Sequence, residues 1–452
     1  MVITRCARAS VLAAAAFLLS SCGGGGAGSP IVPASAIVSA VGASSTSKTV
    51  IATPAPASTP TPASAIVSAV ALSPTSKNVV ATPAPASTPV SVTASVSSTS
   101  PYSWSNGRQI PASFLNGDFS ASGPLYQQLS AAPQLDPNSA SAVSYYFAGN
   151  APEFEAGWID GDKNQAEYDY NFPIYVASSS DPLVTIVCDH LALAACSDGG
   201  VRIHMPALAQ QAGGTDHHLA VLEAGGTEYD FWLVSSNPPY SNGSSFSASG
   251  ETHLSSGGAA GADYVAPGFN VGAATAGGIA LSIGQIYTSE LAAGVINHAI
   301  AVVFPCATNA WVYPASQTTG TCATGQGMPL GSRIWWQPTD AQTGAMSVSR
   351  DMKTVLTALH HYGGFYIDST VGGGNINGQG GGMAAHLESE EAYWIYGNGR
   401  NPALAYAASA PGWAHITGSS GVNRYLLAEL GSSVDFLDNL KLIAPCVTRQ
   451  TC

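Results

Sequence analysis

The chain has 452 residues, of which 27 are Asp or Glu and 14 are Lys or Arg, so its formal charge is −13 at neutral pH. Residues 1–100 contain no acidic residue, and residues 101–452 therefore carry a charge of about −17. This charge repels phosphate backbones and excludes nucleic acid as an expected partner. It also argues against a strongly anionic polysaccharide, unless the few arginines line one cleft. Few charged and many Gly, Ser and Ala residues are typical of exported β-rich proteins.

The amino terminus has the pattern of a bacterial lipoprotein signal. Arg5 and Arg8 precede an apolar run from Val11 to Leu19, which is followed by Ser20-Ser21-Cys22. The run is too short to span a bilayer and has the length of a signal-peptide core. We predict a signal peptide over residues 1–21, lipid attachment at Cys22, and anchoring to a bacterial membrane facing the periplasm or the cell exterior. An ordinary secretory signal cleaved elsewhere is the alternative, and it also implies export.

Residues 22–100 are rich in Ala, Ser, Thr and Pro and contain no aromatic residue. PASAIVSAV starts at Pro33 and again at Pro62, and TPAPASTP starts at Thr53 and again at Thr82, so a 29-residue segment is duplicated. Such a segment buries too little surface to offset the entropy of ordering it. The sequence therefore predicts a disordered stalk before a globular domain at residues 101–452.

Six of the eight cysteines lie in the expected globular domain as three pairs that are close in sequence. Six cysteines allow 15 pairings, and proximity favours one of them. Export to an oxidising compartment agrees with disulfide formation. We predict three bonds: Cys188–Cys196, Cys306–Cys322 and Cys446–Cys452.

Short apolar segments between Gly, Asn, Ser and Pro clusters predict many strands in the globular domain. The clearest are residues 172–178, 183–190, 201–206, 298–304 and 333–338. One helix is expected in the segment that starts at Ser347, where Val355, Leu356 and Leu359 have helical spacing, and a shorter one at 289–293. The pattern favours a mainly β domain, of the β-sandwich or jelly-roll kind, with one or two short helices.

The segment 215–234 has the pattern of a β-hairpin around Gly225-Gly226. A loop of three residues, 224–226, makes the numbers of facing residues sum to 450, and a slip by one residue would move every side chain to the other face. The odd loop gives an apolar face of Leu219, Val221, Tyr229, Phe231 and Leu233. The opposite face then holds Asp216, His218, Ala220, Glu228, Asp230 and Trp232.

Two carboxylates, an imidazole and an indole on one face can serve glycoside hydrolysis. One carboxylic acid protonates the leaving oxygen, a second carboxylate attacks or activates water, and an aromatic ring stacks on the sugar. Asp216 and Asp230 are the predicted catalytic pair, with Glu228 as a substitute, His218 as a proton carrier or orienting group, and Trp232 against the sugar. The alternative is an exposed acidic face of an antiparallel sheet.

Further candidates lie on other predicted strands. Arg333 and Trp335 share one face of RIWWQP, where the guanidinium can bind a carboxylate and the indole can stack on a sugar. A structural ion pair is the alternative for Arg333. His298 lies on an apolar strand face, as a buried core histidine or a catalytic base, and Asp368 faces the same cleft or ends a strand.

Neither a metal nor a cofactor is expected. Neighbours on a strand point to opposite faces, so Asp216, His217 and His218 cannot bind one ion together. The sequence has no HExxH motif, and no cysteine spacing suits zinc.

Several segments resemble a group of largely uncharacterised secreted bacterial β-rich proteins, some of which carry lectin-like or cell-surface modules. The resemblance covers roughly Ser113–Thr370. It includes FPIYVASSSDP, IHMPALAQQAGGTDHHLAVLEAGGTEYDFW, ELAAGVINHAIAVVF, MPLGSRIWWQP and ALHHYGGFYIDS. It implies one coherent domain and a connection with polysaccharides, and its motif positions are Asp216, His218, Asp230, His298, Arg333 and Asp368.

Three functions remain open from the sequence. The leading one is hydrolysis of an extracellular or cell-wall polysaccharide by Asp216 and Asp230. A polysaccharide lyase would use His218, His298 or a tyrosine as base, with Arg333 neutralising a uronate. A non-catalytic glycan-binding lipoprotein or adhesin would use Trp232 and Trp335 to bind sugar.

Overall fold

The structure is a computed structural model that describes part of the chain. The described residues are 124–148, 153–160, 171–189, 196, 199–223, 227–255, 274–318, 320–323, 325–369, 382–389, 402–417, 423–430 and 434–452. The expected signal peptide, Cys22 and the expected stalk lie outside these residues. Contacts divide the chain into Met1–Pro89 and Val90–Cys452, and all described residues belong to the second unit. None of the helices described has the length and apolar character needed to cross a membrane.

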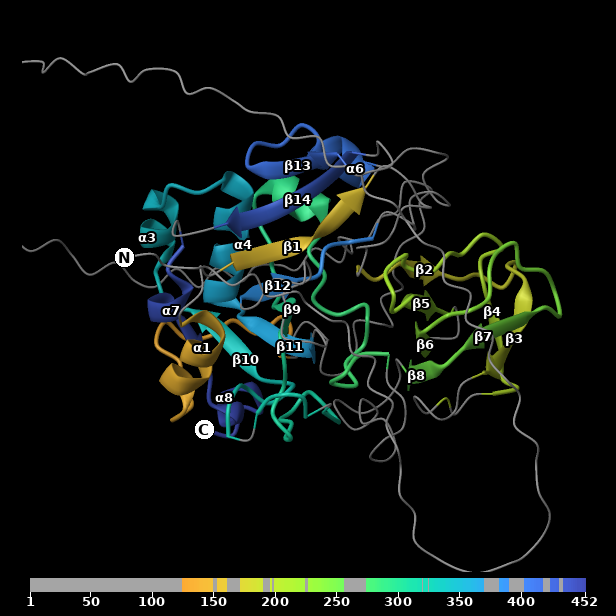
Figure 1. Ribbon diagram of the computed structural model, residues 1–452, viewed down its shortest axis with the longest axis horizontal. Coiled ribbons are helices and arrows are strands. Elements are labelled where there is room, and N and C mark those ends of the chain that lie inside the picture. The colour runs from red at the N-terminus through yellow and green to blue at the C-terminus, as the bar shows by residue number, and fades with distance from the viewer. Residues whose placement is uncertain are drawn as a thin grey trace, which may run out of the picture. The chain divides into compact units, whose positions relative to one another are not determined.

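The largest element is an eight-stranded mixed sheet (Figure 1). Its pairs β1/β12 and β9/β11 are parallel, and the other neighbours are antiparallel. In spatial order the strands are β13 (Trp413–Thr417), β14 (Asn423–Leu430), β1 (Glu153–Asp160), β12 (Met383–Ala385), β9 (Ile300–Phe304), β11 (Gly364–Ser369), β10 (Arg333–Trp336) and β15 (Leu440–Leu442).

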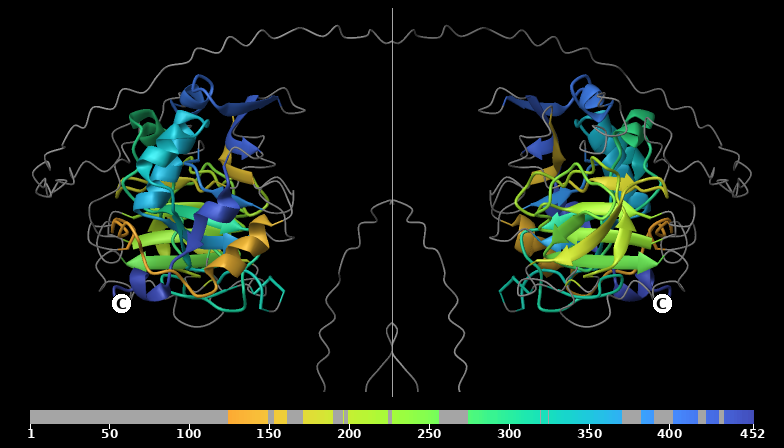
Figure 2. Two further views of the ribbon diagram at one scale, coloured as in Figure 1. Left: turned by 90° about the vertical axis from the view of Figure 1, so that its left-hand side faces the viewer. Right: turned by 90° about the vertical axis from the view of Figure 1, so that its right-hand side faces the viewer.

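Two smaller sheets are built from residues 174–255, and their yellow-green strands face the viewer in the right-hand view of Figure 2. The four-stranded sheet has the order β2 (Ile174–Val176), β5 (Leu219–Leu222), β6 (Thr227–Trp232) and β8 (Gly250–Ser255). The three-stranded sheet has the order β4 (Arg202–His204), β3 (Leu183–Cys188) and β7 (Ser245–Ala248). The pairs β2/β5 and β3/β7 are parallel.

Both expected helices form. The longer one, α4 (Arg350–His361), begins after Ser349, whose hydroxyl accepts a hydrogen bond from the Met352 amide, and it buries Val355, Leu356 and Leu359. The shorter one, α2 (Thr288–Ala293), ends at Gly294, whose φ of 77° is one that glycine adopts without steric cost. Further short helices are α1 (Ser139–Phe147), α3 (Asp340–Ala345), α6 (Pro402–Ala407), α7 (Phe436–Asn439) and α8 (Pro445–Thr448).

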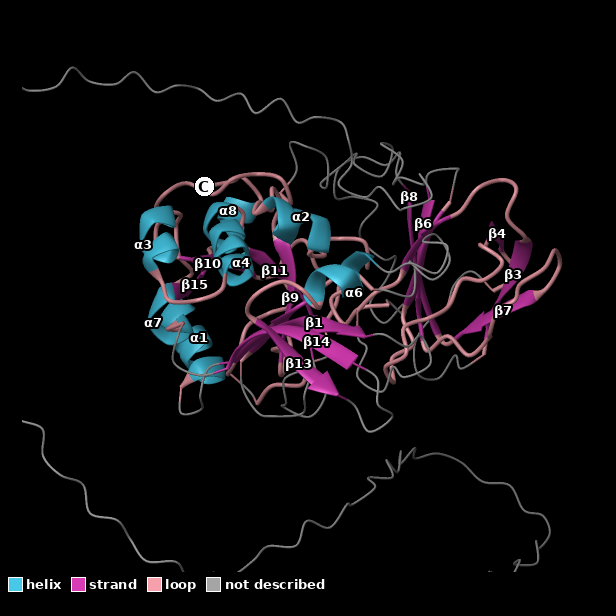
Figure 3. Cartoon of the chain, turned by 90° about the horizontal axis from the view of Figure 1, so that it is seen from above, coloured by secondary structure: helices cyan, strands magenta, loops and turns pink. Residues whose placement is uncertain are grey.

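Helices cover both faces of the large sheet near β10. Successive side chains of a strand point to opposite faces. Trp335 accordingly points toward α4, where its indole nitrogen donates to the His360 carbonyl at 2.9 Å, while Trp336 packs against Phe436 of α7. Figure 3 shows β10, β11 and β15 between α4 on one side and α1 with α7 on the other.

The mainly β fold is confirmed, and the five predicted strands and three predicted disulfides all form. The sheets are mixed, whereas an ordinary jelly roll is antiparallel. The parallel pairs join strands far apart in the sequence, such as β1 with β12, and strand periodicity carries no signal for such pairing.

Candidate functional site

The predicted hairpin register is confirmed. Leu219 faces Phe231, Ala220 faces Asp230, and Val221 faces Tyr229, so the facing numbers sum to 450. The loop 224–226 itself lies outside the described residues. The face that carries Glu228 and Asp230 is not an open trough, however, because these residues are only 4% and 1% exposed.

Glu228 and Asp230 instead fasten the hairpin to the segment 281–282. The amide and hydroxyl of Ser282 donate to Glu228 at 3.1 and 2.6 Å, and the Leu281 amide donates to Asp230 Oδ2 at 3.1 Å. Burial raises the pKa of Glu228, and hydrogen bonds from Ser282 and Asp230 partly oppose this. A bond between two carboxyl groups requires a proton between them. The contacts of this pair are therefore those of a structural anchor, and they correct the expectation that Asp230 lines a cleft.

Asp216 lies just before β5, next to Trp232. The indole nitrogen of Trp232 donates to Asp216 Oδ1 at 3.2 Å, and the Leu233 amide donates to the Asp216 carbonyl at 2.8 Å. The backbone is strained on both sides of this contact, because His217 has φ 45° and Leu233 has φ 53°. Left-handed conformations cost such residues about 1–3 kcal/mol and are concentrated at functional sites.

Asp368 reaches the same region from the large sheet. The pairing of β11 with β9 shifts between Tyr366 and Asp368, so Ile367 is an extra residue in the strand. A bulge of this kind re-aims the side chain that follows it. Asp368 then accepts hydrogen bonds from the Ser369 amide, at 2.7 Å, and from the backbone of Ala276.

Gly277 is needed for this arrangement. Its amide donates to the Ile367 carbonyl at 2.9 Å, which holds the segment 276–277 against the bulge. A Cβ atom at position 277 would lie 2.7 Å from that carbonyl oxygen, which is closer than side chains tolerate. The absence of a side chain at Gly277 thus allows the Ala276 backbone to reach Asp368.

Asp216 and Asp368 are electrostatic neighbours. Burial and the negative charge of Asp216 raise the pKa of Asp368 to about 7. Burial also raises the pKa of Asp216, while the hydrogen bond from Trp232 and the nearby His217 lower it in part. We call Asp216, Trp232 and Asp368 the acidic centre; all three residues are partly exposed, so they remain accessible from solvent.

His218 is buried, and its ring contacts residues other than the three of the acidic centre. Its Nε2 is 2.9 Å from the Ala274 carbonyl, and its ring meets Phe172 edge to face at a centroid distance of 4.9 Å. Burial lowers the pKa of His218 to about 3. The imidazole is therefore uncharged at neutral pH, which does not suit the predicted role of proton carrier.

His298 has the buried environment expected from its apolar strand face. Its Nε2 is 3.1 Å from Glu290 of α2, and its Nδ1 is 2.9 Å from the Ala299 carbonyl. Burial lowers the pKa of His298, but the adjacent Glu290 carboxylate outweighs this effect and raises it. The sequence prediction missed Glu290, although its spacing of eight residues from His298 across a short helix could have indicated the pair.

Arg333 is buried and has no carboxylate partner among the described residues. Its Nε donates to the Tyr362 carbonyl at 2.8 Å, its Nη2 donates to the carbonyls of Gln127 and Tyr362, and its guanidinium lies over the Phe365 ring. Burial lowers the pKa of Arg333 to about 9. With 1% exposure it cannot meet a large substrate, and the expected ion pair is replaced by contacts to main-chain carbonyls.

Trp335 forms part of a separate open groove, together with Gln337 and residues of α3 and α7. Only 4% of Trp335 is exposed, so its indole contributes an apolar wall and not a broad stacking surface. The structure thus brings together three of the predicted site residues, Asp216, Trp232 and Asp368, and places the others elsewhere. Within the described part of the chain, no three His, Cys, Asp or Glu side chains are grouped so that they could hold a metal ion.

Compared with known proteins, the chain matches no family model, no curated protein and no solved structure. A proposal for the function therefore has to be based on the chemistry of the acidic centre.

Proposed function

We propose that the protein is an exported glycoside hydrolase that cleaves an extracellular or cell-wall polysaccharide, with Asp216 and Asp368 as its two carboxyl groups. The observation that supports this proposal is the acidic centre itself: the Trp232 indole donates to Asp216, the Ser369 amide donates to Asp368, and burial together with the charge of Asp216 raises the pKa of Asp368 to about 7. Glycosidases need one carboxyl that keeps its proton at the working pH and one that is ionised. In this proposal Asp368 is the carboxyl that keeps its proton and Asp216 is the ionised one; both are partly exposed.

The environments favour different roles for the two groups. Asp368 has the higher affinity for a proton that a general acid needs, and it would protonate the glycosidic oxygen as the bond to the sugar carbon breaks. Asp216, with the Trp232 N–H on its carboxylate, would attack the sugar carbon or remove a proton from the water that attacks it. Water supplies the hydroxyl group of the new reducing end. Asp368 thereby takes the place that the sequence pattern gave to Asp230.

The lyase alternative gains less support. A lyase needs a base and a cation at the same uronate, but Arg333 and His298 each lie in their own buried polar contacts. The three disulfides are consistent with an oxidising compartment and so support export. Attachment to a membrane through a lipid on Cys22 remains part of the proposal.

A polysaccharide screen tests the function. The full chain is incubated with neutral and uronate-containing polysaccharides, while reducing ends and the ultraviolet absorbance of unsaturated sugars are followed. The proposal requires new reducing ends without that absorbance, and their loss in Asp216→Asn. Unsaturated products would identify a lyase. Binding without any product, unchanged in Asp216→Asn, would identify a glycan-binding protein.

The pH profile of hydrolysis is expected to be bell-shaped, with its optimum on the acid side of neutrality. Activity should rise with pH as Asp216 ionises, and it should fall as pH rises through about 7, where Asp368 loses its proton. The two apparent pKa values of this profile describe the interacting pair and not the individual residues. Trp232→Phe removes a hydrogen bond that favours the ionised form of Asp216, so its acid limb should move to higher pH. Full activity of the wild type above pH 9 would contradict these roles.

Gly277→Ala is expected to lower kcat/KM at least tenfold and the free energy of unfolding by about 1–2 kcal/mol, because the added methyl group forces the segment 276–277 away from Ile367. Gly344→Ala is the matched control: its Cβ meets nothing within 4 Å, and alanine favours the helix there. Steady-state kinetics and urea unfolding measure both effects. Equal kinetics in the two variants would show that Gly277 does not position the acidic centre.

A further inference from the structure

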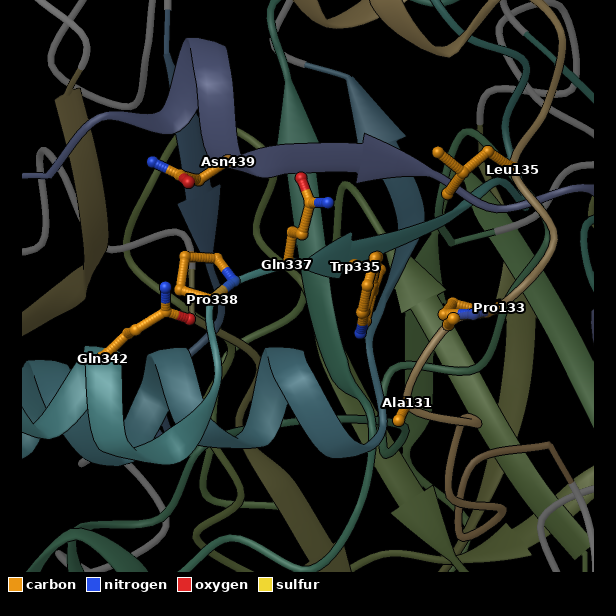
Figure 4. Close-up of a pocket in the computed structure, with 9 residues that line it drawn as sticks. Ala131, Pro133, Leu135, Trp335, Gln337, Pro338, Gln342 and Asn439 are labelled. Atoms are coloured by element: carbon orange, nitrogen blue, oxygen red, sulfur yellow. The ribbon is translucent and has the colours of Figure 1, made fainter. Parts of the chain in front are cut away.

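The groove beside Trp335 has a volume of about 450 Å³, within the usual range for small-molecule sites. Its lining comes from four places in the chain: the segment 131–135, the end of β10 with Gln337 and Pro338, Gln342 of α3 and Asn439 of α7. Figure 4 shows Gln337 at the centre, between Trp335 with Pro133 and Leu135 on one side and Asn439 with Pro338 and Gln342 on the other. Distant segments thus meet around one open hollow.

Three carboxamides provide the polar groups of this groove, and two are held in place. Gln342 Oε1 accepts hydrogen bonds from the amide and hydroxyl of Thr339 at 2.9 and 3.0 Å, which leaves its NH₂ group as a donor. Asn439 Nδ2 donates to the Asp435 carbonyl at 2.9 Å, which leaves Oδ1 as an acceptor. The backbone of Gln337 is fixed by a 2.9 Å bond from its amide to the Asn439 carbonyl, and its side chain is exposed.

The chemistry of the lining favours an uncharged ligand. None of the residues that line the groove is ionisable, so a bound cation or anion would have no opposite charge to pair with. The Gln342 donor, the Asn439 acceptor and the Gln337 carboxamide lie beside a partly apolar wall of Trp335, Pro133, Pro338 and Leu135. Sugar hydroxyls both donate and accept, and pyranose rings have apolar C–H faces, so a neutral glycan matches both parts of the lining.

The groove and the acidic centre are separate. β10 runs antiparallel to β11, with Arg333 facing Phe365 and Ile334 facing Gly364, so Gln337 lies beyond the first residue of β11. Asp368 is near the other end of β11, four residues from Gly364, or about 13 Å along an extended strand. A sugar unit bound in the groove would therefore not be the unit that lies at the acidic centre.

We propose that this groove is a second binding site, for a neutral oligosaccharide or polysaccharide. The inference goes beyond the proposed hydrolysis, since binding here needs no catalysis. Its expected role is to hold an uncharged glycan against the domain.

The test is titration of the full chain with soluble neutral oligosaccharides of glucose, mannose and galactose, with an oligouronate as the charged comparison. Isothermal calorimetry measures the affinity for the wild type, Gln337→Ala, Gln337→Glu and the control Gln326→Ala, an exposed glutamine outside the groove. Asp368→Asn provides a background in which the sugar is not consumed.

We expect a neutral sugar to bind in the Asp368→Asn background, at least threefold weaker binding with Gln337→Ala added, and no change with Gln326→Ala. A preference for the oligouronate, or equal affinity in all groove variants, would overturn the inference. So would binding of the proline-rich peptide of residues 53–67 with displacement of the sugar, because the groove would then hold the chain's own proline-rich segment. Binding of a neutral sugar without any hydrolysis by the wild type would refute the hydrolase proposal and leave this site standing.

Discussion

Replacing Asp368 by asparagine is expected to reduce kcat/KM for polysaccharide hydrolysis by about 10²–10⁴, the usual contribution of a general acid or base. Asparagine keeps an acceptor for the Ser369 amide but has no proton to give to a leaving oxygen. The fold should be retained, because burial already disfavours the charged carboxylate at this position. Steady-state kinetics of the purified variant, with thermal unfolding as a check on folding, measure both effects.

The controls separate the acidic centre from the structural carboxyl pair. Asp438→Asn changes an exposed acid on α7 and should leave both kinetics and stability unchanged. Asp230→Asn should alter stability more than the chemical step, since Asp230 binds the Leu281 amide. If Asp368→Asn kept full activity and Asp230→Asn lost it without loss of stability, the catalytic pair would be Asp216 and Asp230, as the hairpin pattern predicts.

Arg333→Met is expected to lower the free energy of unfolding by about 3 kcal/mol. Methionine fills a similar volume, but it removes three charge-assisted hydrogen bonds, so the Tyr362 carbonyl loses two donors and the Gln127 carbonyl loses one. The variant also avoids the cost of burying a guanidinium without an opposite charge, and this gain offsets part of the loss. The hydrogen bonds outweigh it, because each bond to a charged group contributes about 1.5–3 kcal/mol. Urea unfolding monitored by tryptophan fluorescence measures the difference.

Arg333→Lys is the matched comparison for the shape of the guanidinium. Lysine keeps the charge, but a single ammonium group cannot reproduce the planar fork that spans two carbonyls. We therefore expect Arg333→Lys to be destabilised as well. An Arg333→Met variant with unchanged stability and weaker substrate binding would instead support the substrate-binding role that the sequence indicates.

The hairpin illustrates which structural features a sequence pattern can predict and which it cannot. The alternation of apolar and polar residues predicted the pairing of Leu219 with Phe231 and of Ala220 with Asp230, since period and loop length determine which side chains share a face. The pattern does not say what covers that face. Ser282 and Leu281 lie about 50 residues further along the chain, and they turn an apparent acidic surface into a buried anchor.

The acidic centre depends on features that a linear pattern does not contain. Asp368 was a separate candidate, and its meeting with Asp216 requires the contact of Gly277 with Ile367 and the bulge in β11. The strained backbone at His217 and Leu233 is likewise a tertiary feature, because a left-handed φ is uncommon for residues other than glycine. The burial of His298, in contrast, can be predicted from the sequence, because its neighbours on the strand face are apolar.

Asp216 and Asp368 are 152 positions apart in the chain; Asp216 precedes β5 of the four-stranded sheet, and Asp368 lies on β11 of the eight-stranded sheet. An unfolded precursor crossing a membrane would hold two ordinary, unrelated aspartates. Their shifted proton affinities arise only once the sheets have come together. If the chain is exported unfolded, as proposed, the catalyst would therefore be inactive until the two sheets have assembled.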